Sequence, residues 1–440
     1  MSGLAREAVP EVGRRALARV GWRLVPFLML LYFVSFLDRV NIGFAALTMN
    51  KDLGFSNTVF GLAGGLFFAG YFLLGVPSNL MLRRVGARVW IAVLMIGWSI
   101  VSAANAFVVG PHSYYAVRFL LGLAEAGFFP GVIYYLGIWF PARKRAAMIG
   151  AFMTAAPLST ALGSPVSAQL LQLRGLMGLA GWQWMFILEA LPALLLGVAV
   201  LFVLPDRPSV APWLAEDERA WLVATLAREE AETATLAKQN VWAGLSDWRV
   251  IVLCFAYFGT AAGLYVVGFW GPLMLSQFHL SITRIGTLNL IPGAVAVVVM
   301  VLWGWSSDRS GERVWHTAIA CLVSAAGLFY GGVAGSVAGV VVALTLATVG
   351  VNATKGPIWS LPTLFLTGPA AAAGIAAINA VGNIGGFAGP YLMGYLKDLT
   401  GSYAGGLYFS GATLVVSAVA VLFLKWAQGR SALAVARAGQ

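Results

Sequence analysis

Residues 79–88 carry the sequence NLMLRRVGAR, and residues 304–313 carry GWSSDRSGER in a matching position later in the chain. Each stretch is a short charged turn between two long apolar runs, and Gly86 aligns with Gly311. A sequence pattern that recurs at long distance indicates two similar structural units. The repeat therefore predicts two related halves, each with one such charged turn.

The apolar runs on either side of these turns have the length of membrane spans, which need about 20 residues to cross a bilayer. They lack the alternation of barrel strands, so their backbones are satisfied as helices. We therefore predict an all-α membrane protein with twelve transmembrane helices in two six-helix pseudo-repeats. The runs lie at about 24–48, 57–82, 88–109, 113–140, 146–173, 183–204, 250–278, 284–306, 314–334, 339–366, 371–396 and 403–426.

The composition agrees with a protein embedded in lipid. The 440 residues are 60% hydrophobic and 10% charged, with a mean hydropathy of +0.84, whereas about a quarter of the residues in soluble proteins are charged. The net charge of +11 is scattered in short clusters rather than along one stripe, so the sequence indicates no nucleic-acid partner. Cys254 and Cys321 both fall within apolar runs, which excludes an extracellular disulfide scaffold.

The distribution of Lys and Arg predicts the orientation. Most of the 28 basic residues fall in the leader, in the charged turns, in residues 205–249 and near the C-terminus. All of these lie on one side of the proposed spans. The opposite side holds Lys51, Arg174, Arg284 and Lys397. Because cytoplasmic loops carry an excess of positive residues, we expect both termini in the cytoplasm.

The apolar runs and the charged stretches between them divide the chain into five segments. The leader contains Arg and is followed by a run too long for a signal peptide, so we expect no cleavage. The connector opens with PDRP and continues as a charged sequence of high helix propensity that cannot cross lipid. The predicted segments are an N-terminal cytoplasmic segment 1–23, a six-helix bundle 24–204, a central cytoplasmic loop 205–249, a second bundle 250–426 and a cytoplasmic tail 427–440.

Five charged residues lie deep within the proposed spans, away from their ends: Asp38, Arg39, Arg118, Glu125 and Lys355. A charge at the centre of a bilayer costs roughly 2.5–3.5 kcal/mol on insertion scales, so each one needs a partner, water or a function. Arg118 and Glu125 are separated by about two helical turns, which places a cation and an acid on one helix face roughly 10 Å apart.

Two interpretations of these charges remain open. They form internal salt bridges, either Asp38 with Arg118 or Arg39 with Glu125, or they serve a pathway for anions and protons. Replacing a buried ion pair with apolar packing is often neutral or stabilising, so ion pairs alone are an inefficient way to join helices. Guanidinium groups bind carboxylates in a fork, and a carboxyl group in a dry cleft exchanges protons. The sequence therefore favours the pathway. Glu189, near the outer end of its run, is interpreted as structural.

The second half contributes polar residues in helical spacing. Lys355 and Trp359 share one helix face, and so do Asn379 and Asn383. We predict substrate binding by these residues, although asparagine in a membrane helix equally serves interhelical hydrogen bonds. Tyr71 is a candidate for stacking on a substrate.

No pattern of enzyme residues is present in the sequence. His112, His279 and His316 lie near the ends of runs and lack metal-ligand spacing. No glycine-rich loop followed by Lys is found for holding nucleotide phosphates. We therefore predict no catalytic residue, no metal and no cofactor.

Several motifs together resemble one family. They are LDRVNIGFA at 37–45, GYFLLGVPSNL at 70–80, RFLLGLAEAGFFPG at 118–131, WFPARKRA at 139–146, GWQWMFILEA at 181–190 and PWLAEDER at 212–219. From about Leu24 to Trp426, the chain is similar to the anion/cation symporter family of the major facilitator superfamily. The resemblance implies proton-coupled import of a small organic carboxylate across a bacterial inner membrane by alternating access. Hydroxy acids, sugar acids and aromatic acids are its substrate classes, with a tartrate-like acid favoured here.

The resemblance also implies roles for individual residues. Asp38 and Glu125 match the proton-carrying acids of the family, and Arg39 and Arg118 match its basic residues near the anion. Tyr71, Trp359 and Asn379 match substrate-contacting positions of sugar-acid members. The gating-loop motif of the superfamily is matched by Arg84, Asp308 and Arg309, but in the first half Arg83 stands where the motif has an acid. The implied partners are the organic anion, the proton and the lipid bilayer, and no oligomer is required.

Two alternatives to import stay open at this point. One is an organic-anion exchanger or exporter with no proton driven inward. The other is a non-transporting membrane sensor that signals through residues 205–249.

Overall fold

The computed structural model describes residues 9–236, 241–362, 365–366 and 368–438, so parts of the predicted leader, connector and tail lie outside the described residues. Within the described ranges the regular elements are helices. The first set is α1 (Glu11–Val40), α2 (Ile42–Asp52), α3 (Asn57–Val85), α4 (Ala87–Ala104), α5 (Pro111–Glu125), α6 (Phe128–Trp139), α7 (Ala142–Met153), α8 (Ala155–Leu170) and α9 (Gly181–Val203).

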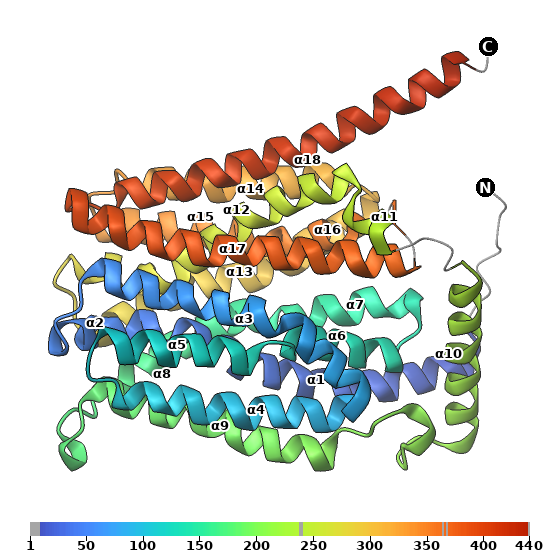
Figure 1. Cartoon of the computed structure of the whole chain (residues 1–440), viewed down its shortest axis with the longest axis horizontal. Coiled ribbons are helices and arrows are strands. Elements are labelled where there is room, and N and C mark those ends of the chain that lie inside the picture. The colour runs from blue at the N-terminus through green and yellow to red at the C-terminus, as the bar shows by residue number, and fades with distance from the viewer. Residues whose placement is uncertain (1–8, 237–240, 363–364, 367, 439–440) are drawn as a thin grey trace.

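Two helices in the connector, α10 (Glu216–Leu236) and α11 (Val241–Leu245), lead to the second set. The second set is α12 (Trp248–Ser276), α13 (Ile282–Ser310), α14 (Val314–Gly331), α15 (Val337–Ala353), α16 (Lys355–Ser360), α17 (Gly368–Thr400) and α18 (Ala404–Ala438). In Figure 1 the two sets lie side by side as separate layers, with α10 across one end of the first layer.

Eleven spans among the described residues are long and apolar enough to cross a membrane. The twelfth membrane helix of the bundle is α17, which has 33 residues. Its Asn379, Asn383 and many glycines lower its hydropathy, but it packs along α3 and α12 in the middle of the molecule. The prediction of an all-α membrane protein with twelve transmembrane helices is thereby confirmed.

Four predicted runs are single spans composed of two helices each. The breaks fall at Asn41, at Gly127, at Thr154 and at Thr354. Gly127 has φ 98°, a left-handed conformation that glycine adopts at little cost. A Cβ at this position would collide with the Ser78 hydroxyl of α3, so a side chain is also excluded by packing.

The first helix begins earlier than the first predicted run, at Glu11. Its amphipathic start packs on α10, where Arg15 pairs with Asp217 at 3.2 Å and Arg19 pairs with Glu218 at 2.8 Å. Polar contacts with the connector thus extend a helix for which hydropathy alone gives a later start.

The two layers meet along α3 with α17, along α8 with α13 and along α2 with α12. Close backbone contacts lie near the end opposite α10. A Cβ at Gly394 would collide with the Asn57 carbonyl oxygen, and a Cβ at Gly61 would collide with that of Pro390. Glycines therefore let α3 and α17 touch through their backbones, which closes the molecule at that end.

Candidate functional site

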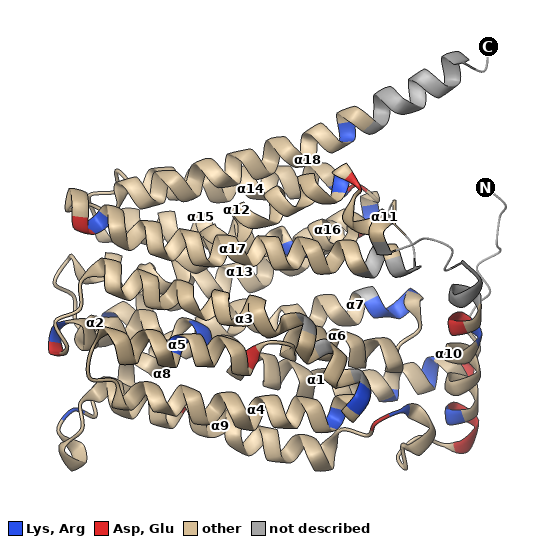
Figure 2. Cartoon of the chain, in the orientation of Figure 1, with Lys and Arg blue, Asp and Glu red and all other residues tan. Residues whose placement is uncertain are grey.

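The buried charges of the first half form one cluster inside the bundle. Figure 2 shows most charged residues near the end that carries α10 and in the loops, with a few deep between the helices. Arg39, close to the end of α1, donates through Nε to Glu125 Oε2 of α5 at 2.6 Å. Glu125 is fully buried and Arg39 is 6% exposed. Of the two ion pairs that the sequence left open, the structure contains this one.

The position of Glu125 follows from the break between α5 and α6. Glu125 is the last residue of α5, and the chain turns at Ala126 and Gly127 before α6 begins. The turn directs this carboxyl group toward α1. A continuous helix through this region, as predicted for residues 113–140, would have placed it by helical periodicity alone.

Arg118 lies two turns earlier on α5 and is fully buried. None of its three guanidinium nitrogens has a hydrogen-bond partner among the described residues. Its central carbon lies 5.3 Å from the centroid of the Phe67 ring, which is the attractive position for a cation over an aromatic face. A buried guanidinium group without an acceptor is costly, because its five N–H donors have lost water and gained no partner.

Asp38 precedes Arg39 on α1 and forms no ion pair with the Lys and Arg residues that the structure describes. Its carboxylate accepts hydrogen bonds from the Trp98 indole at 3.2 Å and from the Ser102 hydroxyl at 2.9 Å. Both donors come from one face of α4, because they are four residues apart. The alternative pair of Asp38 with Arg118 is absent from the ion pairs of the described residues.

Aromatic rings surround the Arg39 guanidinium. Its central carbon lies 5.1 Å from the Tyr71 ring centroid and 5.4 Å from that of Phe67, so one phenyl ring contacts both arginines. Arg39 Nη1 also donates to the Tyr265 hydroxyl of α12 at 3.4 Å. Arg39 thereby links the two halves of the molecule.

The second half presents Lys355 at the start of α16, just after the break at Thr354. The side chain is 8% exposed, and its Nζ donates to Asn352 Oδ1 at 2.8 Å. It also lies 5.5 Å from the centroid of the Phe36 ring. No carboxylate of the described residues lies within ion-pair distance of this ammonium group.

The other polar residues predicted in the second half lie along α16 and α17. Trp359 packs edge-on against Tyr257 with ring centroids 4.8 Å apart, and its indole nitrogen has no partner among the described residues. Asn383 donates to Asn379 at 3.4 Å, so this pair bonds along its own helix. The structure therefore gives each asparagine a local partner.

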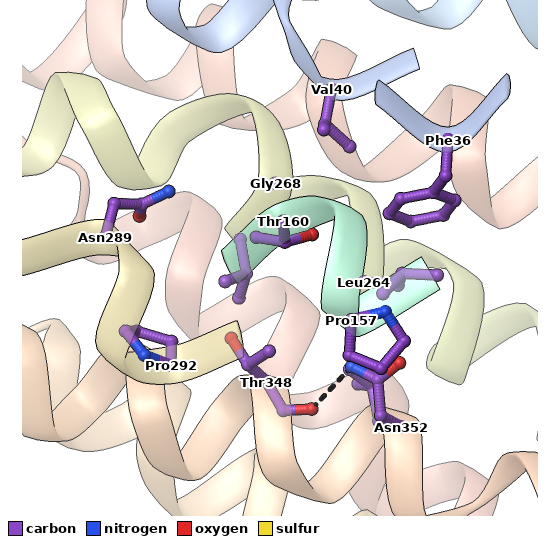
Figure 3. Close-up of a pocket in the computed structure, with 12 residues that line it drawn as sticks. Phe36, Val40, Pro157, Thr160, Leu264, Gly268, Asn289, Pro292, Thr348 and Asn352 are labelled. Carbon is purple, nitrogen blue, oxygen red and sulfur yellow. Dashed lines mark hydrogen bonds between the residues drawn. The ribbon is translucent and has the colours of Figure 1, made fainter. Parts of the chain in front are cut away.

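A small cavity between the halves, of about 20 Å³, has room for about one water molecule. Figure 3 shows Phe36, Thr160, Asn289, Thr348 and Asn352 among the residues around it. This volume is far below the usual range of ligand pockets, about 300–1,000 Å³, so a solute would need the halves to move apart. The predicted charges do not line it directly, but Lys355 contacts the two lining residues Phe36 and Asn352.

The predicted gating loops are described in part. Asp308 accepts from Arg313 Nη1 at 2.6 Å, and Arg309 lies 5.3 Å from the centroid of the Trp305 ring. Arg84 is exposed. These contacts keep the second charged turn ordered, and the gating role of the three residues stays a prediction.

Two residues of the site, Tyr265 and Asn352, are not predicted from the sequence. Asn352 lies three residues before Lys355, a helical spacing that the sequence displays, but the helix break between them hides the contact. Tyr265 carries no signal in the sequence, since its role depends on α12 packing against the first half.

The chain is similar to proteins of one known superfamily. The profile of the Major Facilitator Superfamily matches residues 28–390. The chain belongs to this superfamily. A protein of Agrobacterium vitis named "Putative tartrate transporter" is 60% identical over 414 residues, which cover 94% of this chain and 92% of that protein.

Other relatives agree on the class of protein. The inner membrane transport protein RhmT of Escherichia coli is 38% identical over 92% of this chain and 94% of its own length. The crystal structure of a D-xylose-proton symporter superposes with a TM-score of 0.73 at 16% identity over 91% of this chain and 97% of that one, which shows the shared fold. The chain is thus a multi-pass membrane transporter with bacterial relatives and not an enzyme.

Proposed function

We propose that this transporter is a proton-coupled symporter that imports a small organic carboxylate, with a tartrate-like acid favoured. Membership of the superfamily supports transport, and the name of the 60% identical relative supports the substrate class. The charge arrangement supports the coupling. Transport would proceed by alternating access, with the solute bound between the two halves.

The observation that carries the proposal is the unpartnered guanidinium of Arg118. It is completely buried, it has no acceptor among the described residues, and it shares the Phe67 ring with Arg39. A substrate carboxylate would supply the missing acceptors in a bidentate arrangement. The cost of the empty site then becomes part of the binding free energy.

The Arg39–Glu125 pair supplies a coupling mechanism. While Glu125 is ionised, its carboxylate occupies Arg39 at 2.6 Å. A proton on Glu125 removes that charge and releases Arg39 for the incoming anion. Binding of the proton and binding of the carboxylate therefore favour each other, which is the reciprocity that symport needs.

Asp38 is the second proposed proton carrier, because it is buried without a cation and is held by two neutral donors. Lys355 would attract the anion from the second half. Tyr71, Trp359, Asn379 and Asn383 would contact the remainder of the substrate. These residues come from both halves of the molecule, which agrees with a solute that contacts both.

The positions of the charged turns support an orientation in a bacterial inner membrane. The end that carries α10 holds the clustered Arg and Lys residues, so we propose that this end and both termini face the cytoplasm. The domain limits 1–23, 24–204, 205–249, 250–426 and 427–440 form part of the same proposal. Arg84, Asp308 and Arg309 would belong to the cytoplasmic gate.

Purified protein in vesicles with an imposed pH gradient tests the coupling. The wild type is expected to accumulate tartrate when the outside is acidic. Glu125→Gln is expected to lose this uphill accumulation while it retains exchange of labelled for unlabelled anion, because a neutral side chain leaves Arg39 permanently free. Gradient-driven accumulation by Glu125→Gln would refute the coupling role. A wild type that ignores the gradient and requires internal anion would be an exchanger.

Binding by Arg118 is tested with Arg118→Lys. A lysine keeps the charge but provides no planar fork, so tartrate affinity is expected to fall at least tenfold, equivalent to about 1.4 kcal/mol. Asp52→Asn is a suitable control, because Asp52 accepts the Trp182 indole at 3.0 Å outside this cluster. Wild-type affinity in Arg118→Lys would show that Arg118 has only a structural role.

A further inference from the structure

Glu189 of α9 is a third buried carboxyl group in the first half. It is 2% exposed and has no cation within ion-pair distance among the described residues. Ser167 of α8 donates a hydrogen bond to Oε1 at 2.5 Å, and Asn41 donates through Nδ2 to Oε2 at 2.9 Å. Two neutral donors hold this group, whereas Glu125 has an arginine.

Asn41 occupies a special place, since it is the single residue between α1 and α2. Its amide nitrogen donates to Glu189, but its Oδ1 is buried and has no hydrogen-bond partner among the described residues. An ionised carboxylate can only accept hydrogen bonds, so it leaves this oxygen unsatisfied. A protonated carboxyl group also donates, and a carboxylic acid facing a carboxamide forms two hydrogen bonds in place of one.

The surroundings of Glu189 allow a proton to arrive. Asn41 and Ser167 line a second, small cavity of about 10 Å³, close to the space that one water molecule needs, and this cavity also borders Gly268 and Asn289 of the second half. The polar lining gives a water molecule several hydrogen-bond partners. Asn289 donates to Ser164 across this cavity at 2.8 Å, so the cavity lies at the contact between the halves.

The charged groups around Glu189 favour uptake of a proton. On α1, Asp38 lies one turn before Asn41, and the intervening Arg39 is already paired with Glu125. The sequence of α8 contains no ionisable residue, and Arg88 of α4 lies at the far end of its helix beside Asp206. Lys51 and Asp52 end α2, where Asp52 accepts from Trp182. An ionised Glu189 therefore meets the charge of Asp38 without a free cation beside it.

We propose that Glu189 binds and releases a proton in each transport cycle, and that Asn41 transmits its charge state to the segment of α1 that carries Asp38 and Arg39. The inference rests on the proposed symport and adds a third proton-exchanging group to it. The inference also gives the break at Asn41 a function, because a change in the hydrogen bond between Asn41 and Glu189 acts at the junction between α1 and α2.

The test is the steady-state accumulation of tartrate in vesicles with the membrane potential clamped at zero. Each coupled proton multiplies the accumulation ratio tenfold per unit of pH difference, because one unit corresponds to a tenfold ratio of proton concentrations. With a gradient of one unit, Glu189→Gln is expected to lower the ratio tenfold while transport continues. Asp52→Asn, an acid-to-amide change outside the proposed pathway, is expected to keep the wild-type ratio.

A structural role for Glu189 gives a different result. It would slow uptake in Glu189→Gln but leave the final ratio unchanged, and that outcome overturns the inference even where wild-type symport is established. A wild type without gradient dependence overturns the proposed symport, and this inference falls with it.

Ser167→Ala decides the question if Glu189→Gln does not fold. This variant keeps the carboxyl group and removes one donor to its ionised form. The pH midpoint of uptake is expected to move to higher pH, with the accumulation ratio retained. An unchanged midpoint in a folded Ser167→Ala protein would contradict a proton on Glu189.

Discussion

Asp398, near the end of α17, holds the two halves together at the end opposite α10. Its Oδ1 accepts from the backbone N–H of Asn57 at 3.2 Å and from the Asn57 side chain at 2.7 Å. Its Oδ2 accepts from the backbone N–H and from the hydroxyl of Thr58, both at 2.6 Å. Because α3 begins at Asn57, a carboxylate of one half caps the first turn of a helix in the other half.

The free energy that this contact contributes can be estimated from the helix cap and from the charge at the helix N-terminus. Loss of a capping side chain costs about 0.5–2 kcal/mol, and a charge at a helix N-terminus adds about 0.3–1 kcal/mol at exposed positions. Asparagine also caps helices, so Asp398→Asn loses the charge and one of the two acceptor oxygens rather than the whole cap. Asp398 is exposed, so we take about 1 kcal/mol for this change, discounted for solvent screening. When this end opens, water replaces the cap. The variant therefore shifts the equilibrium away from the closed end by roughly fivefold.

Distance measurements between spin labels test this shift. Val109 and Val333 are suitable sites, because they are 85% and 70% exposed and lie in loops of different halves at that end. The native Cys254 and Cys321 are buried and would be replaced by alanine. The long-distance population is expected to grow in Asp398→Asn and not in Lys397→Gln, its neighbour on α17. Equal populations in the wild type and Asp398→Asn would refute the capping role.

Three further variants test the fold and the site. Gly127→Ala places a side chain at φ 98° and against Ser78, so thermal unfolding should show a loss of at least about 1–2 kcal/mol in the free energy of unfolding. The control is Gly110→Ala, at an extended glycine with open space around it, which should unfold like the wild type. Lys355→Gln removes a buried cation that lacks a carboxylate partner among the described residues, so calorimetry should find weaker tartrate binding without loss of thermal stability. Burial alone would raise the pKa of Glu312, but hydrogen bonds from Lys425 and from two backbone N–H groups at the start of α14 outweigh it and lower this pKa. The lowered pKa means that ionised Glu312 stabilises the folded protein. This stabilisation is present above the ordinary carboxyl pKa and is lost as the pH falls through the lowered pKa. Glu312→Gln should therefore cost about 1 kcal/mol of unfolding free energy near neutral pH and nothing in acid, as measured by thermal unfolding across pH.

The fold could be predicted from the sequence because the lipid environment leaves few choices. A long apolar run has to satisfy its own backbone, so helix is the only open structure for it. Among the described spans of the bundle, helix α17 falls short of the hydropathy of the others, because its asparagines and glycines make it less apolar. Packing in the middle of the bundle allows this composition, since its neighbours are mostly other helices and not lipid.

The identity of the buried charges was also predictable, but their partners were not. A charge inside an apolar run is visible in the sequence, and Asp38, Arg39, Arg118, Glu125 and Lys355 all prove to be buried. Which acid pairs with which base depends on helix breaks that periodicity does not reveal. The structure pairs Arg39 with Glu125, the last residue of α5, and Arg118 is left without a hydrogen-bond acceptor in the part of the chain that the structure describes.

The helix breaks and the buried charges belong to one arrangement. Asn41 follows Asp38 and Arg39, Gly127 follows Glu125, and Thr354 precedes Lys355. A straight helix fixes the direction of each side chain by its turn, whereas a break lets a charged group point where its partner or ligand lies. A break also leaves backbone groups unpaired, which is tolerated at membrane depth only where protein or water satisfies them. The residues that interrupt the helices should therefore matter to transport as much as the charges, and substitutions that straighten a break should disturb anion binding more than they disturb insertion into the membrane.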